Sequence, residues 1–258
     1  MKPLLEIEHL NKSFGGIKAV NSCSFAVPHG KIVGLIGPNG AGKTTVFNLI
    51  TGFLGSDSGK IKLDGVSLVG MSPDRIARMG ISRTFQMIRL FPHMTVIDNM
   101  MLAIKNEREG LFDAVFRIPP LSTEEKHNEE RCMEMLEYVG LETKKHEKAK
   151  NLSYGQQKLL EIARALIADP EILLLDEPAA GVNLTMLKKI GDLLKKLRSQ
   201  GKTILVIEHN MEFIMNLCDT VVVLDYGQEI AVGAPHQVRK NKKVLDAYLG
   251  NINVKIVT

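Results

Sequence analysis

The chain has 258 residues, of which 45% are hydrophobic and 24% charged, and its formal net charge is +4. This length allows either one domain with an insertion or two small domains, and the weak positive charge forms no basic tract that would favour nucleic acid. No apolar run approaches the ~18 residues of a membrane span, and the acidic N-terminus lacks the apolar core of a secretory signal. Three widely spaced cysteines show no pairing or metal pattern, which fits a reducing cytoplasm; they are Cys23, Cys132 and Cys218.

The N-terminal part of the chain predicts a strand, a glycine-rich loop, a helix and a hairpin. Apolar and acidic residues alternate over 5–8, which predicts an edge or half-buried strand. The apolar run 31–36 ends at the glycine-rich loop, and a helix over 43–54 is expected directly after it. Residues 60–63 precede the pair Asp64-Gly65, so we expect a hairpin strand with an Asp-Gly turn.

The middle of the chain and its C-terminal part carry different patterns. Helical patterns replace strand patterns between about 87 and 167, where a capping box at 122–125 opens a helix expected to end at Gly140. Short apolar runs return after residue 170, and helical segments separate the first three of them; the runs span 172–175, 203–207, 220–224 and 229–232. Strands that alternate with helices predict an α/β fold with a mostly parallel sheet covered on both faces.

The glycine-rich loop fits a phosphate-binding loop between a strand and a helix. It reads Gly37-Pro38-Asn39-Gly40-Ala41-Gly42-Lys43-Thr44-Thr45. Its glycines let several N–H groups turn toward phosphate oxygens, and the helix N-terminus adds positive potential. We expect Lys43 to reach the β- and γ-phosphates and the Thr44 hydroxyl to bind Mg²⁺. An ordinary glycine-rich turn is the alternative, and the flanking strand and helix disfavour it.

Two carboxylates follow the apolar run 172–175. Asp176 ends this run, so its side chain is expected at the carboxyl edge of a central strand, where open α/β sheets bind ligands. A carboxylate there can hold the Mg²⁺ shell through water. Glu177 points differently, so we expect it to act as general base on the attacking water. The alternatives are a turn residue for Asp176 and a solvated charge for Glu177.

Five motifs follow one another in a fixed order along the chain. They are the phosphate loop, Gln86, the segment Leu152-Ser153-Tyr154-Gly155-Gln156, the pair Asp176-Glu177, and His209. This order resembles the ATP-binding-cassette (ABC) ATPases over essentially the whole chain, and general phosphate-loop ATPases lack the 152–156 segment. The resemblance implies a single ABC ATPase domain. Its nucleotide-binding α/β core, with an antiparallel N-terminal β subdomain, would span 1–86 and 168–258, and an inserted helical subdomain over 87–167 would carry the signature segment.

The resemblance also implies that two subunits share each ATP. ABC ATPases act as head-to-tail pairs, so Ser153, Gly155 and Gln156 would bind the ATP held by the partner's phosphate loop. The residue type agrees, because Ser153 is a good N-cap for a helix through Leu166 and a helix N-terminus attracts phosphate. Ser153 as a cap and nothing more is the alternative.

Three further roles come from the resemblance. Gln86 would sense Mg²⁺ and the attacking water and couple to a membrane partner, where a solvated glutamine is the alternative. His209 would contact the γ-phosphate, and a surface histidine is the alternative. Phe14 would stack on adenine, although a phenylalanine in a β-rich segment is often a core residue. The expected catalytic residues are thus Lys43, Gln86, Glu177 and His209; the expected metal ligands are Thr44, Gln86 and Asp176; the expected cofactors are ATP and Mg²⁺.

Two positions depart from the general family pattern. Tyr154 stands where that pattern has glycine, and Asn183 stands where many members have aspartate. Asn183 keeps the shape and hydrogen-bonding capacity of aspartate but loses its charge. Neither change touches the expected catalytic residues, so hydrolysis is still expected, and the departures bear on the coupling between the two subunits.

Several segments resemble one branch of the family, the larger of the two ATPase subunits of branched-chain amino acid importers. They are 82–91, 152–157, 177–181 and 227–235, together with an insertion near 110–120. This resemblance implies import of leucine, isoleucine and valine, or of related polar amides and amino acids, and it is analogy alone because no residue here contacts the substrate.

The same resemblance implies the partners. They are a second ABC ATPase subunit (a copy or a paralogue), transmembrane permease subunits and, indirectly, a substrate-binding protein outside the membrane, with the chain peripheral on the cytoplasmic face. Flexible, Met-rich surfaces suit a partner helix, so Met87, Leu90 and Phe91 either reach a permease groove or belong to the core of the helical subdomain.

Three other functions remain open. A lipid or lipopolysaccharide exporter ATPase has a similar sequence. A soluble ABC ATPase acting on DNA or ribosomes is disfavoured, because the chain has one cassette and no long heptad run. A nucleotide sensor without turnover is disfavoured by the intact Glu177 and His209.

Overall fold

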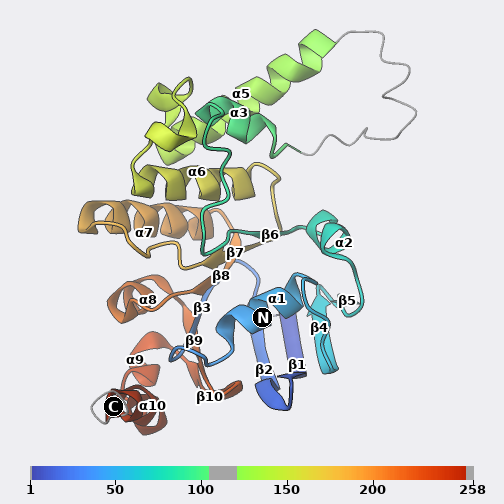
Figure 1. Cartoon of the computed structure of the whole chain (residues 1–258), viewed down its shortest axis with the longest axis vertical. Coiled ribbons are helices and arrows are strands. Elements are labelled where there is room, and N and C mark those ends of the chain that lie inside the picture. Colours follow the sequence, from blue (N-terminus) through green and yellow to red (C-terminus); the bar gives the residue numbers. More distant parts are fainter. Residues whose placement is uncertain (1, 105–120, 254–258) are drawn as a thin grey trace. The chain divides into compact units, whose positions relative to one another are not determined.

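The computed structural model describes residues 2–104 and 121–253 and divides into two compact units (Figure 1). One unit consists of Met1–Gln86 and Glu171–Thr258, and the other of Met87–Pro170. The expected insertion near 110–120 lies outside the described residues, as do side chains of the expected capping box. Within the described ranges, no helix combines the length and the apolar character needed to cross a membrane.

A four-stranded antiparallel sheet forms the N-terminal part of the first unit. Its order is β2-β1-β4-β5, and its strands are β1 (Pro3–Phe14), β2 (Ile17–Pro28), β4 (Ser58–Leu63) and β5 (Val66–Ser67). The strand predicted at 5–8 is half-buried, but it is not an edge strand, because β2 and β4 pair with its two sides. Asp64 and Gly65 have φ of 44° and 83°, so the predicted Asp-Gly hairpin turn is confirmed.

A six-stranded sheet forms the centre of the first unit. Its order is β10-β9-β3-β8-β7-β6, with β3 (Ile32–Ile36), β6 (Ile81–Arg83), β7 (Ile172–Asp176), β8 (Thr203–Ile207), β9 (Thr220–Asp225) and β10 (Gln228–Gly233). All neighbouring strands are parallel except β10, which is antiparallel to β9. Every residue of β3, β7 and β8 is buried, as short apolar runs in a parallel sheet require.

Helices pack on both faces of this central sheet. Val33 and Leu35 of β3 join a buried cluster with Phe47 of α1 (Lys43–Ile50), and this cluster also contains residues of the antiparallel sheet. Gly34 faces the other way. A Cβ there would lie 3.1 Å from the Cδ1 atom of Ile214 on α8 (Met211–Leu217), so glycine allows the helix to approach. The remaining helices of this unit are α2 (Pro73–Arg78), α7 (Leu184–Ser199), α9 (Pro235–Val238) and α10 (Lys242–Asn253).

Helix α1 ends earlier than the sequence predicts. The expected range was 43–54, but the helix stops at Ile50. Gly52 has φ of 72°, a conformation that ends helices, and the Leu54 N–H donates to the Asn48 oxygen at 3.1 Å and closes the last turn. The predicted end at 54 is wrong because Gly52 adopts a left-handed conformation that does not continue an α-helix.

The second unit is helical over the part that the structure describes. Its elements are α3 (Val96–Met101), α5 (Leu121–Val139), α6 (Tyr154–Leu166) and two 3₁₀ turns, Glu142–Lys144 and Ala149–Asn151. The helix predicted to end at Gly140 is confirmed, since Gly140 has φ of 70° directly after α5. The α/β fold with a mostly parallel sheet, an antiparallel N-terminal sheet and an inserted helical part is therefore confirmed.

Candidate active site

The phosphate loop joins β3 to α1 and packs tightly against its neighbours. Gly37 and Gly42 have φ of 151° and 97°. A Cβ at Gly37 would lie 2.1 Å from the Leu224 oxygen, and one at Gly42 would lie 2.3 Å from the Ala19 oxygen. Only glycine fits these two positions, because both contacts are with backbone atoms that cannot turn away.

The side chain of Lys43 is buried inside this loop. Its Nζ atom donates to the backbone oxygens of Gly37 and Pro38, each at 2.8 Å. Burial lowers the pKa of the ammonium group, and the negative charges of Glu177 and Asp176 oppose that shift. The two carboxylates therefore favour the charged form of the lysine. Three residues of this region are exposed: Asn39 and Gly40 in the loop, and Thr44 in the first turn of α1.

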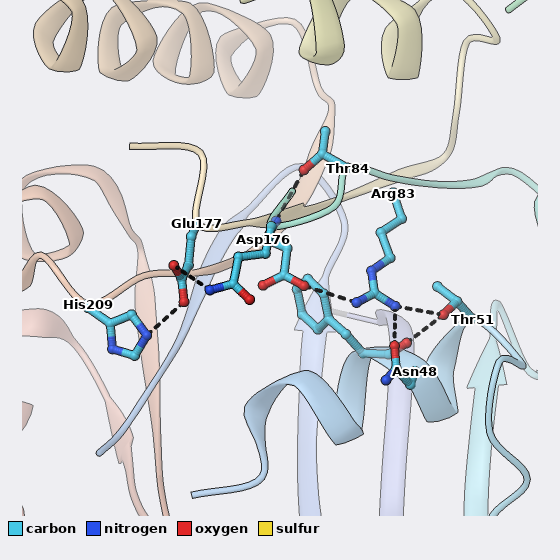
Figure 2. A network of polar contacts seen from close by, with 9 residues as sticks. Asn48, Thr51, Arg83, Thr84, Asp176, Glu177 and His209 are labelled. Atoms are coloured by element: carbon cyan, nitrogen blue, oxygen red, sulfur yellow. Dashed lines mark hydrogen bonds and ion pairs between the residues drawn. The ribbon is translucent and has the colours of Figure 1, made fainter. Parts of the chain in front are cut away.

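Asp176 and Glu177 point to different partners, although they are neighbours in sequence (Figure 2). Asp176 is the last residue of β7, is almost fully buried, and accepts from Arg83 Nη2 at 3.0 Å. Glu177 has φ of 52°, and its N–H donates to the Ile207 oxygen at 2.9 Å. This backbone turn directs the Glu177 side chain toward His209, away from the side of Asp176 that meets Arg83 (Figure 2).

Glu177, Gln86 and His209 form one polar cluster, of which Figure 2 labels Glu177 and His209. The Oε1 atom of Glu177 lies 2.8 Å from His209 Nε2, and its Oε2 atom accepts from Gln86 Nε2 at 3.3 Å. The three side chains follow the ends of three adjacent parallel strands, β7, β8 and β6. The carboxyl edge of the sheet thus collects the three residues that the sequence placed far apart.

Two buried residues of this region were missed at the sequence level. One is Arg83, whose side chain is 6% exposed. Glu208 accepts from the N–H of Ala179 at 2.7 Å and from the N–H of His209 at 3.1 Å, so it connects the end of β8 to the segment after β7. Burial raises the pKa of Glu208, and these backbone hydrogen bonds oppose the shift. A carboxylate directly after a buried strand was the available signal.

The signature segment lies in the second unit at the start of α6. Ser153 is its N-cap: the Ser153 hydroxyl accepts the N–H of Gln156, and the Gln156 side chain accepts the N–H of Ser153. The predicted cap is confirmed as a full capping box. Tyr154 is exposed, Lys158 Nζ lies 5.8 Å from its ring centroid, and Gly155 is buried.

Phe14 and Asn183 also have defined surroundings. Phe14 ends β1 and is 45% exposed, and Lys12 Nζ lies 5.5 Å from the centroid of its ring, so the alternative that it is a core residue is wrong. Asn183 is the N-cap of α7, where its side-chain oxygen accepts the Met186 N–H at 2.9 Å. Asparagine and aspartate serve equally well in this capping role.

Comparison with known proteins places these motifs in one family. The family model described as ABC transporter matches residues 20–180, and the model described as branched-chain amino acid ATP-binding cassette transporter matches residues 228–251. The high-affinity branched-chain amino acid transport ATP-binding protein LivG of Escherichia coli (strain K12) is 44% identical over 96% of this chain and 98% of its own length. The corresponding protein BraF of Pseudomonas aeruginosa is 43% identical over the same shares.

Solved structures agree with the sequence comparisons. The ADP conformation of an ATP-binding cassette of an ABC transporter has a TM-score of 0.85 and 34% identity, covering 97% of this chain and 100% of that one. A dimeric post-hydrolysis cassette bound to ADP and phosphate has a TM-score of 0.74 and 27% identity, covering 90% and 98%. With a family model matched over more than half of its length and relatives aligned over nearly all of it, the chain belongs to the ATP-binding cassettes of the ABC transporter family.

Proposed function

We propose that this chain is the ATP-hydrolysing subunit of a membrane importer for branched-chain amino acids. Its family supports the ATPase activity, and the names of its relatives LivG and BraF support the substrate class. The match of residues 228–251 to the branched-chain model supports the same branch.

The observation that carries the proposal is the polar cluster around Glu177. Phosphoryl transfer needs positioned groups more than covalent chemistry, and a carboxylate near the phosphate loop can take the proton of the attacking water. His209 and Gln86 each contact one carboxylate oxygen and hold the group in one orientation. Water attacks the γ-phosphorus of ATP, Glu177 accepts its proton, the bond to the β-phosphate oxygen breaks, and ADP and phosphate leave.

The phosphate loop would bind the nucleotide. Lys43 would neutralise the β- and γ-phosphates, and the loop N–H groups and the start of α1 would attract their oxygens. The residues that bind the nucleotide on this subunit are Gly37, Pro38, Asn39, Gly40, Ala41, Gly42, Lys43, Thr44 and Thr45. The exposed ring of Phe14 would stack on adenine.

The donor set at the sheet edge fits Mg²⁺. Thr44, Gln86 and Asp176 offer hydroxyl, amide and carboxylate oxygens, which are the ligands that Mg²⁺ prefers. Within the described ranges no group of three or more His, Cys, Asp or Glu side chains could form an all-protein cage. A site with few protein ligands, completed by water and phosphate oxygens, is the usual arrangement for Mg²⁺ with a nucleotide.

The capped start of α6 would complete the ATP site of a second subunit. Ser153, Gly155 and Gln156 lie at the N-terminus of a 13-residue helix, where N–H groups and the helix dipole favour the partner's γ-phosphate. The dimeric relative with bound ADP and phosphate supports this pairing. The partner is a copy of this chain or a paralogue.

The helical unit would meet the permease. Met87 and Phe91 are 81% and 50% exposed, Leu90 is half-buried and Met100 is fully buried, so Met87 and Phe91 are the side chains that would be most available to a partner helix. The chain would then lie on the cytoplasmic face of the membrane, and a substrate-binding protein would act through the permease.

The test is ATP turnover of the chain with its permease in proteoliposomes. Glu177→Gln should lower turnover by at least about 100-fold and leave the Kd for ATP unchanged, because the general base is lost and the phosphate loop is not. Glu137→Gln, an exposed substitution on α5, is the matched control and should behave as wild type. Turnover should rise with leucine and its binding protein. Unchanged turnover in Glu177→Gln would contradict the base assignment, and stimulation by lipid alone would contradict the substrate class.

A further inference from the structure

Arg83 and Asp176 form an ion pair in the interior of the first unit. The distance from Arg83 Nη2 to Asp176 Oδ2 is 3.0 Å, and the two side chains are 6% and 2% exposed. Burying two charges is expensive unless their geometry is well defined and further hydrogen bonds support it. The folding of a strand end does not require a buried ion pair, so the pair points to a further role for Arg83 and Asp176.

The same guanidinium also contacts helix α1 (Figure 2). Arg83 Nη1 donates to Asn48 Oδ1 at 2.7 Å and to Thr51 Oγ1 at 3.2 Å. The rings of Phe47 and Phe85 lie 5.4 and 5.1 Å from its central carbon and limit its movement. One planar group thus connects the end of β7 to α1, which a lysine with its single charged atom could not do in the same way.

The contacted residues are Asn48 in α1 and Thr51, its C-cap, and they follow the same side of this helix as Thr44. Thr44, Asn48 and Thr51 are separated by four and three positions, a spacing that places them along one side of a helix. Thr44 and Asp176 are the hydroxyl and the carboxylate that we assign to Mg²⁺. Arg83 therefore holds one donor directly and the helix of the other donor through two hydrogen bonds.

We propose that Arg83 is a positioning residue that sets the location of the Asp176 carboxylate relative to Thr44. This inference rests on the proposed function and adds a residue to which no role has been assigned. If Arg83 only competed with Mg²⁺ for the Asp176 carboxylate, its presence would weaken Mg²⁺ binding. A positioning residue has the opposite effect, because residues that orient metal ligands strengthen metal binding.

The test measures the Kd of a non-hydrolysable ATP analogue in EDTA and in Mg²⁺. The Kd in EDTA divided by the Kd in Mg²⁺ is the enhancement of binding by Mg²⁺. Arg83→Met should lower this ratio by about 10-fold or more, as loss of a ligand-orienting partner does, and should leave the Kd in EDTA nearly unchanged. Arg83→Lys keeps the charge but loses the planar fork, so its ratio should also fall.

Two more variants complete the design. Asn48→Ala cuts one link to α1 and keeps the ion pair, so we expect a smaller loss of the ratio in a stably folded protein. Arg78→Met is the matched control, because Arg78 is exposed on α2 and pairs only with Asp74 among the ion pairs of the described residues. If Arg83→Met does not fold, Arg83→Lys and Asn48→Ala decide the question.

The outcomes separate the possible roles. A lower ratio in Arg83→Lys and Asn48→Ala, with Arg78→Met unchanged, supports positioning. A higher ratio means that Arg83 competes with Mg²⁺, and equal losses in EDTA and Mg²⁺ mean a purely structural role; either result overturns the inference. A wild-type chain that binds no nucleotide would overturn the proposed function itself. If wild type binds the analogue more tightly in Mg²⁺ and the Arg83 and Asn48 variants show the same ratio as wild type, this inference alone is overturned.

Discussion

Substitutions at Ser153 separate its capping role from its proposed contact with phosphate. The Ser153 hydroxyl accepts the Gln156 N–H at 3.4 Å, and alanine removes this acceptor. Loss of a serine N-cap costs about 1 kcal/mol. For a chain of this size that cost corresponds to a melting temperature lower by roughly 2–4 °C. Ser153→Asp supplies another good N-cap and a charge that favours the helix dipole, so this variant should be as stable as wild type.

The aspartate variant should nevertheless lose activity. Its carboxylate would face the partner's γ-phosphate, and like charges brought together cost several kcal/mol, which corresponds to a loss of turnover of roughly 100-fold or more. Ser153→Thr keeps both the cap and the hydroxyl and is the control. Urea unfolding followed by circular dichroism measures stability, and phosphate release measures turnover. Wild-type turnover in Ser153→Asp would refute the phosphate contact, and an alanine variant as stable as wild type would refute the capping argument.

Three further predictions concern the rest of the chain. Gly42→Ala should lower stability in urea by about 3 kcal/mol because its Cβ would meet the Ala19 oxygen, whereas Gly40→Ala, whose Cβ meets nothing within 4 Å, should cost less. Burial raises the pKa of Glu208 above its ordinary 4.5, so the folded state binds that proton more tightly. The melting temperature of wild type minus that of Glu208→Gln should therefore be greatest below pH 4.5 and shrink as the pH rises above that value; a constant difference would count against the shift. Burial also raises the thiol pKa values, to about 12 for Cys23 and about 11 for Cys132, so native protein should resist iodoacetamide at about pH 8 and react only in urea, as mass spectrometry would show; labelling of the native chain would contradict this. The expectation covers all three buried cysteines, Cys23, Cys132 and Cys218.

The strands and the phosphate loop were predictable because their signals are local. Buried parallel strands are short apolar runs, and the chemistry begins where each run ends, as it does at Asp176 and at Glu208 before His209. The glycine pattern before Lys43 likewise depends on a few adjacent residues. The one wrong boundary, the end of α1, also has a local cause, because Gly52 adopts a positive φ that ends the helix.

Long-range pairing was not predictable from one sequence. The place of β1 inside its sheet depends on β4, which lies some fifty residues later, and an alternating pattern does not reveal how many strands flank it. Arg83 pairs with Asp176 across 93 positions, and nothing near Arg83 in the sequence marks it as buried. A lone arginine is normally an exposed residue, so its burial follows only from the fold.

The site also shows why these missed residues matter. Glu177, Gln86 and His209 are recognisable because they fit a motif order, whereas Arg83 and Glu208 support their neighbours through buried hydrogen bonds. Supporting contacts of this kind are visible only when three strand ends are brought to one edge of the sheet.

The most direct test of the central claim is the sedimentation of Glu177→Gln with ATP. If two copies enclose ATP and Glu177 activates the water that cleaves it, the variant should form a stable dimer with ATP and remain a monomer with ADP. Wild type should dimerise only transiently as it turns over, and adding Ser153→Asp to Glu177→Gln should abolish the dimer. A Glu177→Gln protein that binds ATP and stays monomeric would contradict pairing between two copies of this chain and would leave a paralogue as the partner.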